Sequence, residues 1–302
     1  MQFERVVVTM DFNEPAVAAA GWAARHFSPG AELVLVHCIH IPEPPAFLRS
    51  RFPPHEELVE TARVGADKRL REISATLATG RIWLQVRVGR PAEEVARVAT
   101  EFSADLIVVG KHGDRPAPWQ RLGSTAEQVI SYSPIPVLLV TKVPNTAPRK
   151  LLVPLTDAAV TPAVLQCAKF LSLRFDATVR ALHVVSSAVL SHVLSVAAIN
   201  TRVDLNPEQV QQEFREETDR WVERLVKAGL HTERVSCEVA FGDPAHEIVA
   251  AAERLDVDLI VMGRRRARSI RRALVGSVTR EVLRHAQCPV LVVTEPEDEI
   301  AV

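Results

Sequence analysis

Short apolar runs alternate with amphipathic stretches along the chain, and they recur in the same order in both halves. In the first half, the runs and the helical patterns between them fall, in order, at 5–9, 16–26, 32–37, 54–78 and 82–88. In the second half, they fall at 151–155, 163–173, 178–183, 207–228 and 235–241. Continuous apolar runs of this length are typical of buried parallel strands, and apolar positions three to four residues apart indicate helices. The pattern therefore predicts a repeated α/β unit.

Each half closes with the same glycine pattern. A run that starts at Asp105 leads to Gly110-Lys-His-Gly113, nine further residues and Gly123-Ser124. The second copy runs from Asp258 to Gly263-Arg-Arg-Arg266, nine residues and Gly276-Ser277. A glycine-rich turn between a strand and a helix N-terminus is where α/β sheets bind phosphate. The pattern thus marks one candidate anion site in each half.

The order of elements in each half is β-α-β-α-β-α-β-α-β, which predicts a five-stranded parallel sheet with helices on both faces. We expect a first domain over 1–142, a two-proline linker over 143–149, a second domain over 150–295 and a tail over 296–302. The repeat distance is 145 residues at the first helix and 153 at the glycine pattern. The second half therefore carries an insertion near 186–206.

Composition narrows the class of protein. Of 302 residues, 47% are apolar but only 5% aromatic, so we expect cores of Val, Leu, Ile and Ala. The net charge of −1 argues against a general nucleic-acid or membrane-surface binder. The four cysteines form no C-x-x-C pair, so neither a disulfide framework nor a zinc site is indicated. The chain enters its first strand without room for a signal peptide, which favours a cytoplasmic protein with no membrane span.

The first half carries a coherent set of site residues. Asp11 follows a strand and could accept hydrogen bonds from an adenine or a ribose. Gly110 and Gly113 allow the backbone to approach a phosphate. Gly123 and Ser124 open a helix, where free N–H groups favour an anion. A structural alternative fits the same residues: Ser124 caps its helix, and the glycines only turn a long loop.

The second half departs from this set. Thr156 stands where Asp11 stands in the first half, with Asp157 displaced by one, and Arg266 replaces the second glycine. Six arginines lie between Arg264 and Arg272. A solvated basic loop is favoured over a clamp for a phosphate or a polyanionic partner. The second site is expected to be degenerate. His37 and His183 are expected to end the second strand of each half in a structural role.

Each half resembles a universal stress protein domain. The resemblance rests on the order of elements, Gly110-x-x-Gly113-(nine)-Gly123-Ser124, and the closing runs that start at Pro136 and Cys288. It implies a flavodoxin-like sheet of order 3-2-1-4-5 and pairing through the last strands. That pairing would make the chain an intrachain pseudo-dimer, with a further homodimer left open. The implied ligand is ATP or AMP, with Mg²⁺ left open. The implied first site comprises Thr9, Met10, Asp11, Cys38, Val109, Gly110, Gly113, Gly123, Ser124 and Thr125. The weaker second site comprises Thr156, Asp157, Val184, Met262, Gly263, Arg266, Gly276, Ser277 and Val278.

Three functions fit these residues. The favoured one is a stress-response regulatory protein that binds adenine nucleotide, mainly in its N-terminal domain, without turning it over. The second is a slow ATPase or phosphotransferase. Neither a Walker A lysine motif nor a G-x-G-x-x-G fingerprint occurs, and no base is placed to orient a water, which disfavours the enzyme. The third is an interaction scaffold that binds no nucleotide.

Overall fold

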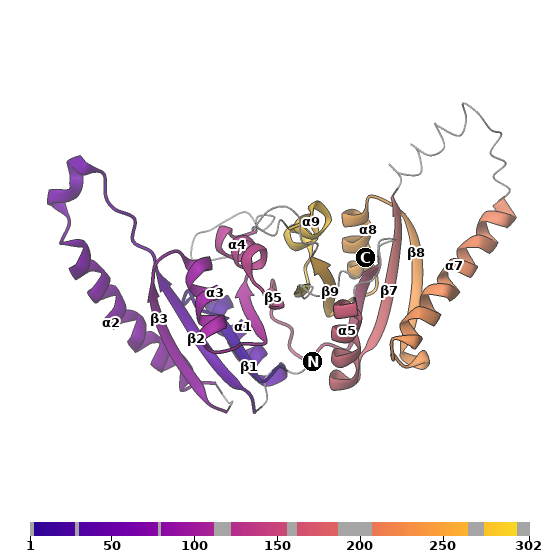
Figure 1. The fold of residues 1–302 in the computed structure, drawn as a ribbon, viewed down its shortest axis with the longest axis horizontal. Coiled ribbons are helices and arrows are strands. Elements are labelled where there is room, and N and C mark those ends of the chain that lie inside the picture. Colours follow the sequence, from indigo (N-terminus) through magenta and orange to yellow (C-terminus); the bar gives the residue numbers. More distant parts are fainter. Residues whose placement is uncertain are drawn as a thin grey trace. The chain divides into compact units, whose positions relative to one another are not determined.

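The computed structural model describes residues 3–27, 30–77, 80–111, 122–155, 162–186, 207–264 and 275–294. The chain divides into two compact units, separated between Asn145 and Thr146. Strands and helices alternate along both units (Figure 1). None of the described helices has an apolar stretch long enough to cross a membrane.

The first unit follows the predicted order of elements. They are β1 (Arg5–Thr9), α1 (Glu14–His26), β2 (Glu32–Ile39), the 3₁₀ helix η1 (Ala46–Arg51), α2 (His55–Ser74), β3 (Ile82–Val88), α3 (Pro91–Glu101), β4 (Leu106–Gly110), α4 (Ser124–Tyr132) and β5 (Val137–Val140). Its strands lie in the order β3-β2-β1-β4-β5, and the pairs among them are parallel.

The second unit repeats this plan. Its described elements are β6 (Lys150–Leu155), α5 (Pro162–Phe175), β7 (Thr178–Ser186), α7 (Pro207–Lys227), η2 (Thr232–Arg234), β8 (Val235–Gly242), α8 (Pro244–Arg254), β9 (Leu259–Arg264), α9 (Ser277–His285) and β10 (Val290–Thr294). The strand order β8-β7-β6-β9-β10 is again 3-2-1-4-5, and the pairs are parallel. The predicted fold class is therefore confirmed.

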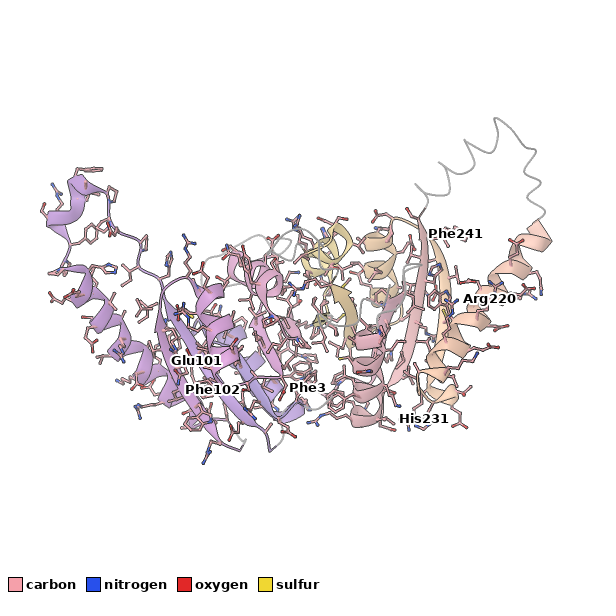
Figure 2. The ribbon with its side chains drawn as sticks, viewed as in Figure 1. Phe3, Glu101, Phe102, Arg220, His231 and Phe241 are labelled. Atoms are coloured by element: carbon pink, nitrogen blue, oxygen red, sulfur yellow. The ribbon has the colours of Figure 1, made fainter. Side chains whose placement is uncertain are left out.

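The core of each sheet is aliphatic, as its composition predicts. Val6, Val7 and Val8 of β1 are all buried. Because successive side chains of a strand point to opposite faces, both faces of the sheet are covered. Some aromatic rings contact one another: Phe3 lies 6.1 Å from Phe27, and Phe102 lies 5.8 Å from Trp83. Figure 2 labels Phe3 and Phe102. Branched aliphatic side chains thus form most of the buried contacts of the strands.

An aspartate before the fourth strand of each unit ties that strand to the first. The Oδ2 atom of Asp105 accepts hydrogen bonds from the backbone N–H groups of Glu4 and Arg5, at 2.8 and 2.9 Å. The Oδ2 atom of Asp258 accepts the same pair from Arg149 and Lys150, at 2.7 and 2.8 Å. These charge-assisted bonds fix the register of the two central strands in both units.

A glycine at the end of the third strand of each unit lies against a glutamate of the next helix. Gly89 has a φ of +148°, and Gly242 has a φ of +153°. A Cβ atom built on Gly89 would meet the Glu94 side chain at 3.1 Å, and one on Gly242 would meet Glu247 at 2.7 Å. Both glycines are needed for space and for backbone conformation.

Two details of the predicted elements are wrong. The second strand does not end at His37 or His183, because β2 continues to Ile39 and β7 to Ser186. These residues keep pairing with the third strand of their unit, so the sheet extends past both histidines. The long helix of the first unit ends at Ser74, before the predicted limit at residue 78.

Candidate functional site

The carboxyl ends of three neighbouring strands meet at one edge of the first sheet. β1 lies between β2 and β4, and the Met10 N–H donates to the Val36 carbonyl at 2.8 Å. This edge therefore gathers the predicted residues Thr9, Met10, Asp11, Cys38, Val109 and Gly110. The side chains of Met10 and Val109 are buried, so neither side chain is available to a ligand.

One hydrogen bond joins the two ends of the glycine loop. The Gly123 N–H donates to the Lys111 carbonyl at 2.9 Å, and α4 begins at the next residue, Ser124. The N-terminus of α4 is thereby held beside the end of β4. Gly113 and His112 lie outside the described residues.

The structural alternative for Ser124 is wrong. Gly123 is the N-cap residue of α4, and Ser124 is its first helical residue, exposed to solvent. A side chain at the first helical position does not cap the helix as an N-cap side chain does. Gly123 has φ −61° and ψ 139°, which any residue can adopt. The backbone conformation at position 123 therefore does not require a glycine.

The Asp11 carboxylate is held by Asn13. The Asn13 N–H donates to Asp11 Oδ1 at 3.2 Å, and the Asn13 amide donates to Asp11 Oδ2 at 2.9 Å. The Asn13 side-chain oxygen in turn accepts the Ala16 N–H at 2.8 Å and caps α1. A carboxylate oxygen has two lone-pair sites, so a single hydrogen bond from Asn13 does not saturate it.

Phe12 lies in a stack of three side chains beside this turn. Its ring is 4.4 Å from the His37 ring, and the Arg69 guanidinium lies 5.0 Å from the Phe12 centroid. His37 Nδ1 is 2.7 Å from the Met10 carbonyl, which can only accept, so Nδ1 carries the proton. Phe12 has a φ of 67°, an uncommon backbone conformation for a bulky residue. α2 and β2 thus both contact the turn that carries Asp11.

The second unit contains a similar stack with a different central ring. Trp221 of α7 stacks on His183 at 5.4 Å, and the Arg224 guanidinium lies 4.7 Å from the Trp221 centroid. Arg224 precedes the buried Leu225, as Arg69 precedes the buried Leu70. The guanidinium and the imidazole occupy matching positions, whereas the central ring comes from a helix instead of a turn. The sequence patterns indicated neither stack.

The second copy of the glycine pattern keeps part of the geometry. Gly276 caps α9, Ser277 begins it, and a Cβ on Gly276 would meet no atom within 4 Å. The Thr279 hydroxyl donates to the Gly263 carbonyl at 3.4 Å. Of the remaining predicted residues, Met262 is buried in β9, Val184 is half-buried in β7, and Val278 is half-buried in α9. Thr156, Asp157 and Arg266 lie outside the described residues.

A buried cation follows the first loop glycine in each unit. Lys111 follows Gly110 and Arg264 follows Gly263, and both side chains are 2% exposed. Burial lowers the pKa of the Lys111 ammonium. Arg264 is the last residue of β9, so the interpretation of it as part of a solvated basic loop is wrong. The other five arginines of that run lie outside the described residues.

Burial raises the pKa of all four cysteine thiols. The Cys38 pKa rises from 9.0 to about 12, mainly through burial and then through the Glu94 carboxylate. Cys167 and Cys288 reach about 12, and Cys237 reaches about 11, again mainly through burial. Among the described residues, no three His, Cys, Asp or Glu side chains form a group that could hold a metal ion.

We therefore expect the native thiols to resist alkylation at pH 8, because the thiolate is the nucleophile. Iodoacetamide should label the folded protein far more slowly than the urea-unfolded protein, as measured by mass spectrometry. A pKa raised by folding contributes stability below the unfolded value near 9.0, and for Cys38 that contribution is lost as pH rises toward about 12. Equal labelling rates in the folded and unfolded protein would contradict the burial.

Comparison with known proteins relates this fold and site to one family. The chain matches the model of the Universal stress protein family twice, over residues 2–141 and 148–294. A universal stress protein of Methanocaldococcus jannaschii is 32% identical over 151 residues, which are 50% of this chain and 85% of that protein. One of Thermus aquaticus is 34% identical over 140 residues, 46% of this chain and 98% of that protein.

A solved structure extends the likeness over both units. The crystal structure of a universal stress protein from Archaeoglobus fulgidus covers 98% of this chain and 100% of its own, with a TM-score of 0.67 and 18% sequence identity. At that identity, the likeness shows the shared fold. The two family matches, one in each half, show that the chain is a tandem member of the universal stress protein family.

Proposed function

We propose that this protein is a stress-response regulator that binds an adenine nucleotide, ATP or AMP, in its first unit without turning it over. The observation that carries the proposal is the hydrogen bond from the Gly123 N–H to the Lys111 carbonyl. It holds the N-terminus of α4 beside the end of β4, one strand away from the end of β1 and Asp11. The helix N-terminus that would bind the phosphates and the carboxylate that would bind the base or ribose thus lie at the same edge of the sheet.

The nucleotide would be held by many weak contacts. At an exposed helix N-terminus, the dipole contributes about 0.3–1 kcal/mol per charge. The N–H groups of Ser124 and Thr125 must therefore act together on the phosphates, because the Gly123 N–H already donates to the Lys111 carbonyl. Asp11 would accept hydrogen bonds from the adenine or the ribose, and the backbone at Cys38 and Val109 would line the base. Mg²⁺, where present, would be held largely by the phosphates.

The absence of turnover is tested by incubating the protein with ATP and Mg²⁺. We expect no ADP above a control without protein, because the sequence contains neither a Walker A lysine motif nor a G-x-G-x-x-G fingerprint. Steady ADP release that Asp11→Ala abolishes would instead support a slow ATPase. Nucleotide binding without turnover would support the regulator. If ATP and AMP caused no thermal shift in the wild-type protein, the scaffold that binds no nucleotide would be favoured instead.

We propose that the second unit binds nucleotide weakly or not at all. Its strand register supports this: Val6 pairs with Leu106, and Leu151 pairs with Leu259. Leu155 is therefore the counterpart of Met10, and the next residue in the sequence is Thr156, in place of Asp11. Gly276 and Ser277 alone provide one helix N-terminus, which is too little for a nucleotide.

Replacing Gly113 by arginine, as in the second copy of the loop, should weaken ATP binding at least about tenfold. A long side chain would stand where the backbone must approach a phosphate, and arginine adopts fewer backbone conformations. Isothermal titration calorimetry measures the change. Gly276→Ala is the control, since its Cβ meets no atom within 4 Å and its unit is not expected to bind. Unchanged affinity in Gly113→Arg would show that an arginine at this loop position does not weaken nucleotide binding, and Arg266 would then be no reason to expect a weak second site.

A further inference from the structure

We propose that Asn13 is a positioning residue for the nucleotide site: its amide holds the Asp11 carboxylate in the orientation that receives the base or ribose. This inference rests on the proposed nucleotide binding by the first unit. It assigns to Asn13 a role beyond capping α1. No sequence motif indicated that role, because the two residues are near neighbours whose contact depends on the turn between them.

The geometry of the turn supports this role. Asn13 makes two contacts with Asp11, one to each carboxylate oxygen, at 3.2 and 2.9 Å. A carboxylate bound at both oxygens has one orientation, whereas a free aspartate samples several rotamers. A ligand that hydrogen-bonds to an ordered carboxylate does not have to order it first. The Asn13 contacts therefore reduce the entropic cost of binding.

The same asparagine is fixed from its other side. Its side-chain oxygen accepts the Ala16 N–H at 2.8 Å, so its amide nitrogen is directed by the start of α1. One amide group thus links a rigid helix to the Asp11 carboxylate. A serine at this position would keep an oxygen acceptor for the helix but could not reach Asp11 with an amide donor.

The ring between the two residues supports the turn. Phe12 holds a φ of 67° between Asp11 and Asn13, and such a conformation persists only where its surroundings hold it. The surroundings here are His37 and Arg69, whose side chains both lie against the Phe12 ring. His37 also bonds to the Met10 carbonyl, on the N-terminal side of Asp11. Residues 10 to 13 are therefore held by β2, α1 and α2 together.

The second half lacks this arrangement at the level of sequence. The strand register makes Thr156 the counterpart of Asp11, so the second half has no carboxylate at this position in its sequence. Thr156 lies outside the described residues. Without that carboxylate, an amide before α5 would have no equivalent group to orient.

The test compares ATP affinity and folding stability in single variants of the full chain. Asn13→Ser keeps the cap acceptor and removes the amide donor, and we expect ATP to bind roughly 2- to 10-fold more weakly. Asn13→Asp also keeps the cap but sets a second carboxylate beside Asp11. It should weaken binding further at pH 7, and added salt should reduce that extra loss. The urea unfolding midpoints of both variants should stay near that of the wild type.

Two more variants keep the test decisive. Arg69→Met removes the guanidinium over Phe12 without touching the cap, and should weaken ATP binding about 2- to 5-fold. Asp243→Ser alters the cap of α8 in the second unit, where the aspartate accepts the His246 N–H, and should leave affinity unchanged. Wild-type affinity in Asn13→Ser and Asn13→Asp would overturn the positioning role alone. No ATP binding by the wild type would overturn the proposed function as well.

Discussion

Replacing Gly242 by alanine is expected to lower the free energy of unfolding by about 2–6 kcal/mol. Gly242 holds a φ of +153°, and an added Cβ would lie 2.7 Å from Glu247 Oε1 and 3.0 Å from its Cγ. An unfavourable backbone region costs about 1–3 kcal/mol, and overpacking adds about 1–3 kcal/mol. Urea unfolding followed by circular dichroism measures the change.

Two glycines of the same chain serve as controls for this prediction. Gly276→Ala should be close to neutral, because Gly276 has φ −57° and no atom within 4 Å of the added Cβ. Gly89→Ala in the first unit should also destabilise, because Gly89 has φ +148° and its nearest contact would be at 3.1 Å. If Gly242→Ala and Gly276→Ala unfolded at the same urea concentration, the assigned backbone and contact would be wrong.

Replacing Asp11 by alanine is expected to weaken ATP binding about 10- to 100-fold. Hydrogen bonds to a charged group contribute about 1.5–3 kcal/mol, and this variant removes the carboxylate that is proposed to bind the base or ribose. Asp11→Asn keeps one acceptor oxygen and should show a smaller loss. Calorimetric titration of both variants with ATP gives the affinities.

A matched exposed carboxylate controls for the loss of one negative charge. Asp67 lies on α2 in an exposed ion pair with Arg71, at 2.7 Å. Asp67→Ala should leave ATP affinity unchanged, since exposed pairs contribute little and the residue is not part of the site. If Asp11→Ala bound ATP as tightly as Asp67→Ala, Asp11 would not contact the nucleotide.

The fold could be predicted from the sequence because its signals are local and repeated. Short runs such as Val6–Val8 are buried on both faces, as parallel strands require, and two copies of each run give the same order twice. Asp105 and Asp258 mark the start of the fourth strand in each half, and both bind the backbone at the start of the first strand. At these two aspartates, a pattern visible in the sequence corresponds directly to a contact in the structure.

The site could be predicted only in part, because its contacts depend on distant elements. The glycine pattern indicated the loop, but not that Gly123 caps α4 or that Lys111 closes the loop. The Arg69–Phe12–His37 stack joins a helix, a turn and a strand, and the second unit places Trp221 from α7 in the corresponding position. No spacing in the sequence indicates which element supplies the central ring.

The central claim is that the chain holds one adenine nucleotide site, in its first unit. Calorimetric titration of the full chain with ATP and with AMP tests it most directly. We expect saturation at one equivalent per chain. At a ligand concentration about 100 times Kd, the free energy of unfolding should rise by about 2.7 kcal/mol. At the same ligand concentration, the 10- to 100-fold weaker binding of Asp11→Ala should reduce that rise to about 0.4–1.4 kcal/mol. No binding, or two equivalents per chain, would contradict the account.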